Sequence, residues 1–93
     1  MIISFADKET ESLYRTGKSR VFPPDIIKRA VRKLDRLHTV EDVNDLKNPP
    51  GNRLHELSED RKGQFSISIN TQWKICFGFN EGNAYDVEIC DYH

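Results

Sequence analysis

Residues 65–90 read FSISINTQWKICFGFNEGNAYDVEIC, and this stretch decides the fold because apolar and polar residues alternate along it. The alternating segments are 65–69, 73–79 and 85–90. A period of two is typical of β-strands that bury one face against a core. Residues 70–72 are a short turn signal, and the Asn80-Glu81-Gly82-Asn83 run offers a glycine for positive φ. The stretch therefore predicts an antiparallel meander.

The alternation also predicts what each face of the sheet carries. Phe65, Trp73 and Tyr85 are expected on the face that the helices cover, with Trp73 in the core. The opposite face is expected to show polar side chains to solvent: Ser66, Ser68, Lys74 and Glu88. Residues 53–57 are expected to add a short strand before the meander. Lys74 follows Trp73 directly, so its side chain is expected on the open face.

The N-terminal half predicts helices preceded by one short strand over residues 1–5. Asp7 is expected to cap a helix that ends near Thr16, before Gly17. A second helix is expected to begin at Pro23-Pro24. Its apolar residues share one helical stripe: Ile26, Ile27, Ala30, Val31, Leu34 and Leu37. A further short helix is expected over residues 40–46, with Thr39 as its cap.

Together these elements predict one domain over residues 1–93, because a chain of this length supports a single modest core. The fold class is α+β. An N-terminal strand and two to three helices are expected to pack on one face of a mostly antiparallel sheet of four to five strands.

Composition places the chain among globular proteins. Charged residues make up 31% and aromatic residues 10%, which does not fit a disordered chain. No apolar run reaches the ~20 residues of a membrane span, so we expect a cytoplasmic protein without a membrane partner. Cys76 and Cys90 have no metal-binding spacing, and we expect two free thiols, buried or half-buried.

The net charge of −1 hides a basic segment between Arg15 and Arg36. This segment carries eight basic residues against two acidic ones, Asp25 and Asp35. Arg29, Arg32 and Lys33 lie on the polar side of the second predicted helix. Such a helix face either is solvated or meets an anionic partner.

The sequence shows no metal-ligand cluster, glycine-rich phosphate loop or cysteine–histidine pair, so we expect no metal and no cofactor. It does carry the groups that cleavage of RNA requires. Imidazoles can take and give protons near neutral pH, and cations can stabilise a phosphorane. The candidate imidazoles and phenol are His55, His93 and Tyr92. The candidate cations are Arg53, Arg61 and Lys74.

A set of short runs resembles the HigB toxins, a branch of the RelE-type superfamily, with the GraT-like HigB members as the nearest pattern. The runs include Pro49-Pro50-Gly51-Asn52-Arg53-Leu54, Gln72-Trp73, Val87-Glu88-Ile89 and the terminal Asp91-Tyr92-His93. The resemblance covers nearly the whole chain, and its tryptophan strand and terminal Asp-Tyr-His are specific when they occur together.

The resemblance implies a RelE-like toxin that is a ribosome-dependent mRNA endoribonuclease. Such a toxin cuts mRNA in the ribosomal A site and leaves a 2′,3′-cyclic phosphate. The implied partners are the 70S ribosome with its mRNA and a HigA-type helix-turn-helix antitoxin, with operator DNA reached only through that antitoxin. Arg29, Arg32 and Lys33 would then meet ribosomal RNA phosphates.

Carried over by position, the catalytic residues are His55, Lys74, Asp91, Tyr92 and His93. The arginine that often follows the family's tryptophan is Lys74 here, which keeps the charge and loses the bidentate fork. A lysine that some members use falls on Ser58. Cationic stabilisation is then expected from Arg53, Arg61 or Lys74.

Other interpretations stay open at this point. His55 fits a solvent-facing strand residue equally well, and His93 fits a frayed terminus. Asp91 either orients His93 or binds a basic neighbour. The alternative function is a non-catalytic module that binds ribosomal RNA or an antitoxin. A DNA-binding regulator has little support, because the basic segment lacks the turn spacing of a helix-turn-helix.

Overall fold

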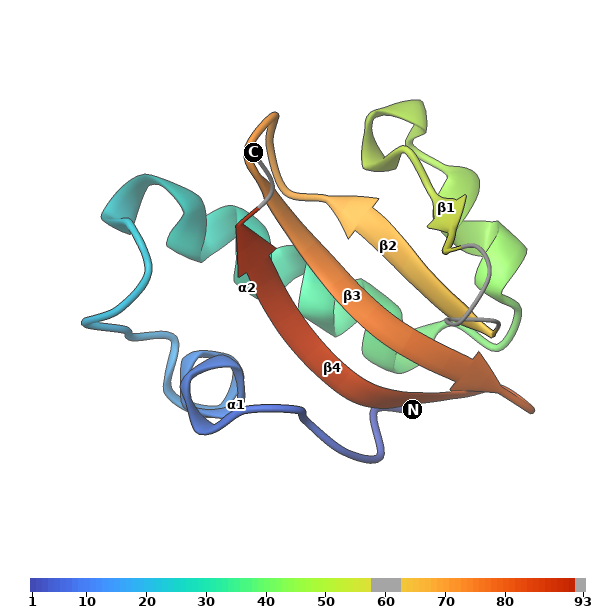
Figure 1. Ribbon diagram of the computed structural model, residues 1–93, viewed down its shortest axis with the longest axis horizontal. Coiled ribbons are helices and arrows are strands. Elements are labelled where there is room, and N and C mark those ends of the chain that lie inside the picture. The colour runs from blue at the N-terminus through green and yellow to red at the C-terminus, as the bar shows by residue number, and fades with distance from the viewer. Residues whose placement is uncertain (58–62, 92–93) are drawn as a thin grey trace.

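A computed structural model describes residues 1–57 and 63–91 of the chain. Two α-helices pack on one face of a four-stranded antiparallel sheet, and the other face is turned towards the viewer in Figure 1. The helices are α1 (Lys8–Thr16) and α2 (Pro24–Thr39). The 3-10 helices are η1 (Val43–Lys47) and η2 (Pro50–Asn52). The strands are β1 (His55–Glu56), β2 (Gln64–Ser68), β3 (Trp73–Asn80) and β4 (Asn83–Asp91), in that order across the sheet.

The meander predicted from alternation is confirmed. Strand β2 pairs with β3 from Gln64↔Gly78 to Ser68↔Lys74, and β3 pairs with β4 from Asn80↔Asn83 to Trp73↔Asp91. The β3–β4 hairpin turns on Glu81 and Gly82, both with positive φ, as the Gly82 signal predicted. Strand β1 is shorter than the predicted 53–57 segment and pairs at His55↔Ser66 and Glu56↔Phe65.

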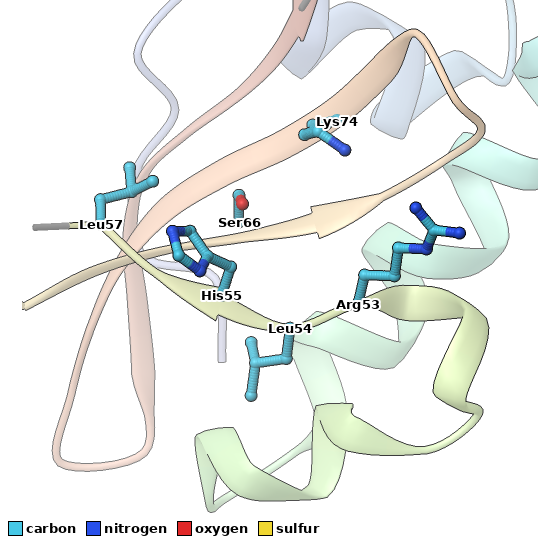
Figure 2. Close-up of a pocket in the computed structure, with 6 residues that line it drawn as sticks. All are labelled: Arg53, Leu54, His55, Leu57, Ser66 and Lys74. Carbon is cyan, nitrogen blue, oxygen red and sulfur yellow. The ribbon is translucent and has the colours of Figure 1, made fainter.

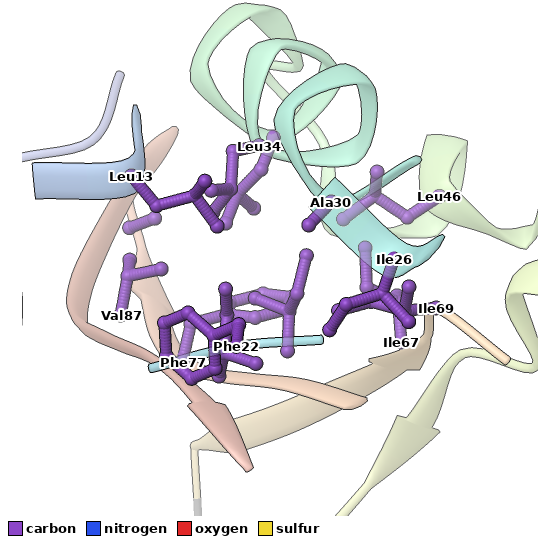
Figure 3. Packing of buried hydrophobic residues seen from close by; sticks show 14 of the residues in the cluster. Leu13, Phe22, Ile26, Ala30, Leu34, Leu46, Ile67, Ile69, Phe77 and Val87 are labelled. Atoms are coloured by element: carbon purple, nitrogen blue, oxygen red, sulfur yellow. The ribbon is translucent and has the colours of Figure 1, made fainter. Parts of the chain in front are cut away.

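Helix α2 supplies the largest share of the helical side of the core. Its buried residues are Ile26, Ala30, Leu34 and Leu37, which lie on the predicted stripe. They face Ile67, Ile75, Phe77 and Val87 of the sheet, and Figure 3 shows this packing. Phe22, just before α2, sets its ring edge-on against the partly buried ring of Trp73, with centroids 5.8 Å apart. The expectation that Trp73 packs with the core is confirmed.

Helix α1 begins and ends as predicted. The carboxylate of Asp7 accepts the backbone N–H of Thr10 at 2.7 Å, and Gly17 ends the helix with φ of 72°. The hydroxyl of Thr10 is fully buried and accepts the backbone N–H of Ile89 at 3.0 Å. This bond satisfies a donor on the outer edge of β4, so α1 is fastened to the sheet edge by a side chain.

The N-terminal segment differs from the predicted strand. Ile2 and Phe5 form isolated parallel bridges with Ala84 and Val87, and no continuous strand forms between them. The third predicted helix is also corrected, because Val40 is extended and ends α2. The shorter η1 begins after Asp42, whose side chain accepts the Asn44 N–H at 2.9 Å, so Asp42 rather than Thr39 is the cap.

One strand residue lies on the opposite face from the one predicted. The register shifts between Cys76 and Gly78, where Asp86 of β4 adopts a φ of 52°. This bulge inserts one extra residue, so the alternation changes phase. Ala84 is therefore buried, and Tyr85 pairs with Gly78 on the open face at 37% exposure. The prediction that the helices cover Tyr85 is wrong for this reason.

Candidate active site

The open face of the sheet carries rows of side chains set by strand register. The row that starts at His55 continues through Ser66, Cys76 and Glu88, each paired to the next. The neighbouring row holds Ser68, Lys74 and Cys90. Strands lie about 4.8 Å apart, so His55 and the β3 positions are about 10 Å apart between backbones.

A hollow of about 510 Å³ opens at the β1 end of this face. Its lining residues are Arg53, Leu54, His55, Leu57, Ser66 and Lys74. Figure 2 shows His55 and Arg53 projecting from the β1 side and Lys74 from β3, with Ser66 between them. Sequence reasoning selected His55, Arg53 and Lys74 as separate candidates, and the fold brings these three together.

The side chain of Lys74 is held in place by Ser68, its neighbour in the same row. Its ammonium group donates to the hydroxyl of Ser68 at 2.9 Å. Ser66 and Ser68 are only 4% and 6% exposed, which corrects the expectation that both face solvent. Both serines sit on an inner strand, where their short side chains lie below longer neighbours such as His55 and Lys74. Ser68 therefore serves as a positioning partner, which the alternation pattern did not indicate.

Asp91 lies apart from the hollow. It pairs with Trp73 at the end of β4, so the pleat places its side chain with Trp73 rather than with Lys74 and Cys90. Its carboxylate accepts from the side-chain amide of Gln72 at 3.2 Å. The end of β4 still runs directly beside Lys74, because Lys74 pairs with Cys90. The remaining candidates Arg61, Tyr92 and His93 lie outside the described residues.

The two thiols lie on the same face as the hollow. Cys76 is buried, Cys90 is half-buried, and neither forms a disulfide, as predicted. Hydrogen bonding to Cys76 and then burial raise the pKa of the Cys90 thiol far above its ordinary value, with a further contribution from the nearby Glu88 carboxylate. A thiol in this state is protonated at neutral pH, so Cys90 contributes no nucleophile.

A second hollow, also of about 510 Å³, lies between α2 and the loop before β1. Its lining residues are Arg29, Arg32, Lys33, Arg36, Pro49 and Asn52. None of its four cations forms an ion pair with any carboxylate in the described part of the chain. Burial, followed by repulsion from Arg29 and Arg32, lowers the pKa of Lys33. The cations of this hollow repel one another, and a bound anion would reduce that repulsion.

Sequence reasoning assigned Arg29, Arg32 and Lys33 to phosphate binding, and it gave no such role to Arg36, on the same basic side of α2, or to Asn52. Arg36 continues the same helix face at a spacing of three to four residues, so the helical period could have identified it. Asn52 is 2% exposed and accepts a hydrogen bond from Lys33, while its amide nitrogen donates to the Leu46 carbonyl at 3.2 Å. A lone asparagine in a Pro-Gly loop carries no local signal for such a role.

Among the described residues, neither hollow has a set of side chains suited to a metal ion. No group of three or more His, Cys, Asp or Glu side chains with metal-binding geometry occurs within residues 1–57 and 63–91. Within the same residues, no helix combines the length and the apolar character that crossing a bilayer demands.

Comparison with known proteins agrees with this architecture. Residues 3–93 match a family described as the RelE-like toxin of the type II toxin-antitoxin system HigB. The chain is 33% identical over 93 residues to "Endoribonuclease HigB" of Proteus vulgaris, covering all of both chains. It is 36% identical over 85 residues to "Toxin HigB-1" of Vibrio cholerae, covering 90% of each chain.

A solved structure shares the fold at low sequence identity. The crystal structure of YafQ from E. coli strain BL21(DE3) superposes with a TM-score of 0.57 and 12% identity, covering 98% of this chain and 93% of that one. The family match spans nearly the whole sequence, and the relatives match at full or nearly full length. This chain therefore belongs to the HigB family of RelE-like toxins of type II toxin-antitoxin systems.

Proposed function

We propose that this toxin is a metal-independent endoribonuclease that cuts mRNA in the A site of the ribosome. The observation that carries the proposal is the hollow on the open sheet face, where His55, Lys74 and Arg53 converge from two strands and a loop. An imidazole beside two cations suits phosphodiester chemistry. The name of the Proteus vulgaris relative, an endoribonuclease, supports the same reaction.

The proposed reaction is attack of a ribose 2′-oxygen on the adjacent phosphorus. A general base takes the 2′-hydroxyl proton, the new O–P bond forms, and the bond to the 5′-oxygen breaks. A general acid protonates that oxygen, which leaves a 2′,3′-cyclic phosphate and a 5′-hydroxyl. We assign the acid and base roles to His55 and His93, with Tyr92 orienting the ribose. Asp91 accepts a hydrogen bond from Gln72 beside Trp73, so we assign it to holding the end of β4 rather than to the reacting groups.

Cationic stabilisation of the phosphorane is assigned to Lys74, together with Arg53 and Arg61. Lys74 suits this role because its ammonium group is already directed by Ser68, which reduces the reorganisation needed in the transition state. Arg53 can place its guanidinium fork against two phosphate oxygens. Arg29, Arg32 and Lys33 are assigned to binding RNA phosphates away from the cut.

The type II family match supports an antitoxin as a partner. We propose a HigA-type helix-turn-helix antitoxin that neutralises the toxin and through which alone the pair contacts operator DNA. The 70S ribosome presents the mRNA substrate, so the site of action is the cytoplasm. No cofactor and no membrane enter the proposal.

Mapping of mRNA 3′ ends after induced expression tests this function. Cuts in codon register are expected with the wild-type chain and should disappear with His55→Ala, His93→Ala and Tyr92→Phe. His38→Asn is the matched control, because His38 accepts the Ile2 N–H through Nδ1 at 3.1 Å, far from the hollow, and asparagine keeps an acceptor. Intact mRNA together with stalled translation would contradict cleavage and favour a non-catalytic ribosome-binding toxin.

A further inference from the structure

A third hollow shares one lining residue with each of the two described above. This smaller hollow of about 220 Å³ is lined by Arg29 and Arg53 together with Gly51 and the end of β2 from Ser68 to Thr71. Arg53 also lines the active-site hollow, and Arg29 also lines the basic hollow on α2. The three hollows therefore form a chain in which each neighbouring pair shares one arginine.

The shared arginines are positioned by the fold itself. Arg29 donates to the Ile69 carbonyl at 3.1 Å, which fixes this α2 side chain at the end of β2. Arg53 adopts a left-handed backbone conformation, with φ of 48° and ψ of 53°, directly after η2. Figure 2 shows the Arg53 side chain extending from the loop before β1. Arg53 lines both the active-site hollow and the smaller hollow. A cation thus lies at each junction between hollows.

The basic hollow on α2 has more arginine and lysine residues in its lining than either of the other two hollows. Arg29, Arg32, Lys33 and Arg36 share one concave surface, and no described carboxylate pairs with them. Crowding of like charges destabilises the unbound state, and a bound phosphate offsets it. A linear polyanion fits three linked basic hollows better than separate small anions, because one strand supplies a phosphate to each.

We propose that the RNA strand cut at the His55 hollow continues over Arg53 and Arg29 into the basic hollow on α2. This inference rests on the proposed function and extends it, since it assigns Arg32 and Arg36 to the substrate strand rather than to ribosomal RNA. The contacts are to phosphates, so this grip is independent of base sequence. The cations of the three hollows then hold the substrate RNA on one side of the scissile phosphate. We call this row of cations the track.

Fluorescence anisotropy with free RNA tests the track without requiring cleavage. The probes are 2′-O-methylated oligonucleotides, which cannot undergo 2′-oxygen attack, of about four and about twelve nucleotides, within the site sizes of small single-strand-binding domains. At low salt the longer probe should bind more tightly. Arg32→Glu with Arg36→Glu should remove that advantage and reduce the salt slope of the longer probe by about 1.4, at about 0.7 per lost phosphate contact.

The control is Lys28→Glu, an exposed α2 residue that lines none of the three hollows. It should change the binding of both probes equally and weakly. Two results would overturn the track: no measurable binding of the longer probe at low salt, or unchanged binding of that probe by the double variant. If the double variant binds the probe normally but sediments poorly with ribosomes, the basic hollow contacts ribosomal RNA instead. Loss of codon-register cuts in His55→Ala is a separate readout that reports on the proposed function alone.

Discussion

Lys33 of α2 donates a hydrogen bond to the side-chain oxygen of Asn52, the residue that precedes Arg53. The amide nitrogen of Asn52 donates hydrogen bonds to the carbonyls of Leu46 and Asn48, at 3.2 and 3.4 Å. One buried amide therefore connects the basic hollow, the η1–η2 loop and the residues that lead into β1. Movement of α2 relative to this loop would displace Arg53.

Asn52→Ala is expected to destabilise the fold by about 1–3 kcal/mol, because it leaves the buried Leu46 carbonyl without the donor of Asn52. Chemical denaturation followed by circular dichroism measures this change. Asn44→Ala is the control, since Asn44 is exposed on η1, and it should stay within about 0.5 kcal/mol of wild type. Equal stability of the two variants would show that the Asn52 amide does not hold the loop.

Lys74→Met is expected to slow mRNA cleavage by about 10²–10³-fold, the usual cost of removing one group that stabilises transition-state charge. Lys74→Arg keeps the cation and should stay within about tenfold of wild type, a span of about 1.4 kcal/mol in barrier height. Cleavage rates in a ribosome-dependent translation reaction give the comparison, with thermal melting to confirm folding. Wild-type cleavage by Lys74→Met would remove Lys74 from the proposed mechanism.

Binding of the longer RNA probe is expected to weaken as pH rises towards the ordinary lysine pKa of about 10.4. Burial and the neighbouring arginines lower the pKa of free Lys33, and a bound phosphate would raise it again. Binding then takes up protons, so affinity falls as pH passes through the lowered pKa. Lys33→Met should flatten this dependence relative to Lys28→Met, as followed by anisotropy on the methylated probe. If Lys33→Met and Lys28→Met show the same dependence of affinity on pH, Lys33 is not the group that takes up the proton on binding.

The Asp86 bulge gives a backbone prediction. Asp86 has a φ of 52°, a region that β-branched residues avoid, so Asp86→Val should destabilise the protein by about 1–3 kcal/mol. Asp86→Gly should be close to neutral, because glycine accepts this conformation while making the unfolded chain more flexible. Tyr85→Val, on the same strand beside the bulge, controls for the loss of an exposed side chain. Equal denaturation midpoints for Asp86→Val and Asp86→Gly would argue against the bulge.

Cys90 is expected to resist alkylation by iodoacetamide at neutral pH, by more than about tenfold relative to a free thiol, because its raised pKa leaves little thiolate. Mass spectrometry of the native protein over time measures the rate at this cysteine. Alkylation in urea should restore the ordinary rate. Rapid labelling in the folded state would show that Cys76 and burial do not protect the thiol.

Local patterns in the sequence determined most of the fold. The period of two along residues 65–90 predicted the meander, and the helical stripe from Ile26 to Leu37 predicted α2 with its buried side. Asp7 and Gly17 predicted both ends of α1. These predictions succeeded because burial of alternate residues and capping of helix ends are decided within a few residues of chain.

Tertiary structure decided which of the candidate residues share a hollow. The residue types of His55, Arg53 and Lys74 could be chosen from the sequence and a family resemblance, but their shared hollow depends on the pairing of three strands. The bulge at Asp86 reversed the side on which Tyr85 lies, and Asn52 gained its role from contacts with α2. Strand register, bulges and buried hydrogen bonds connect residues that are distant in the chain, so no local pattern encodes them.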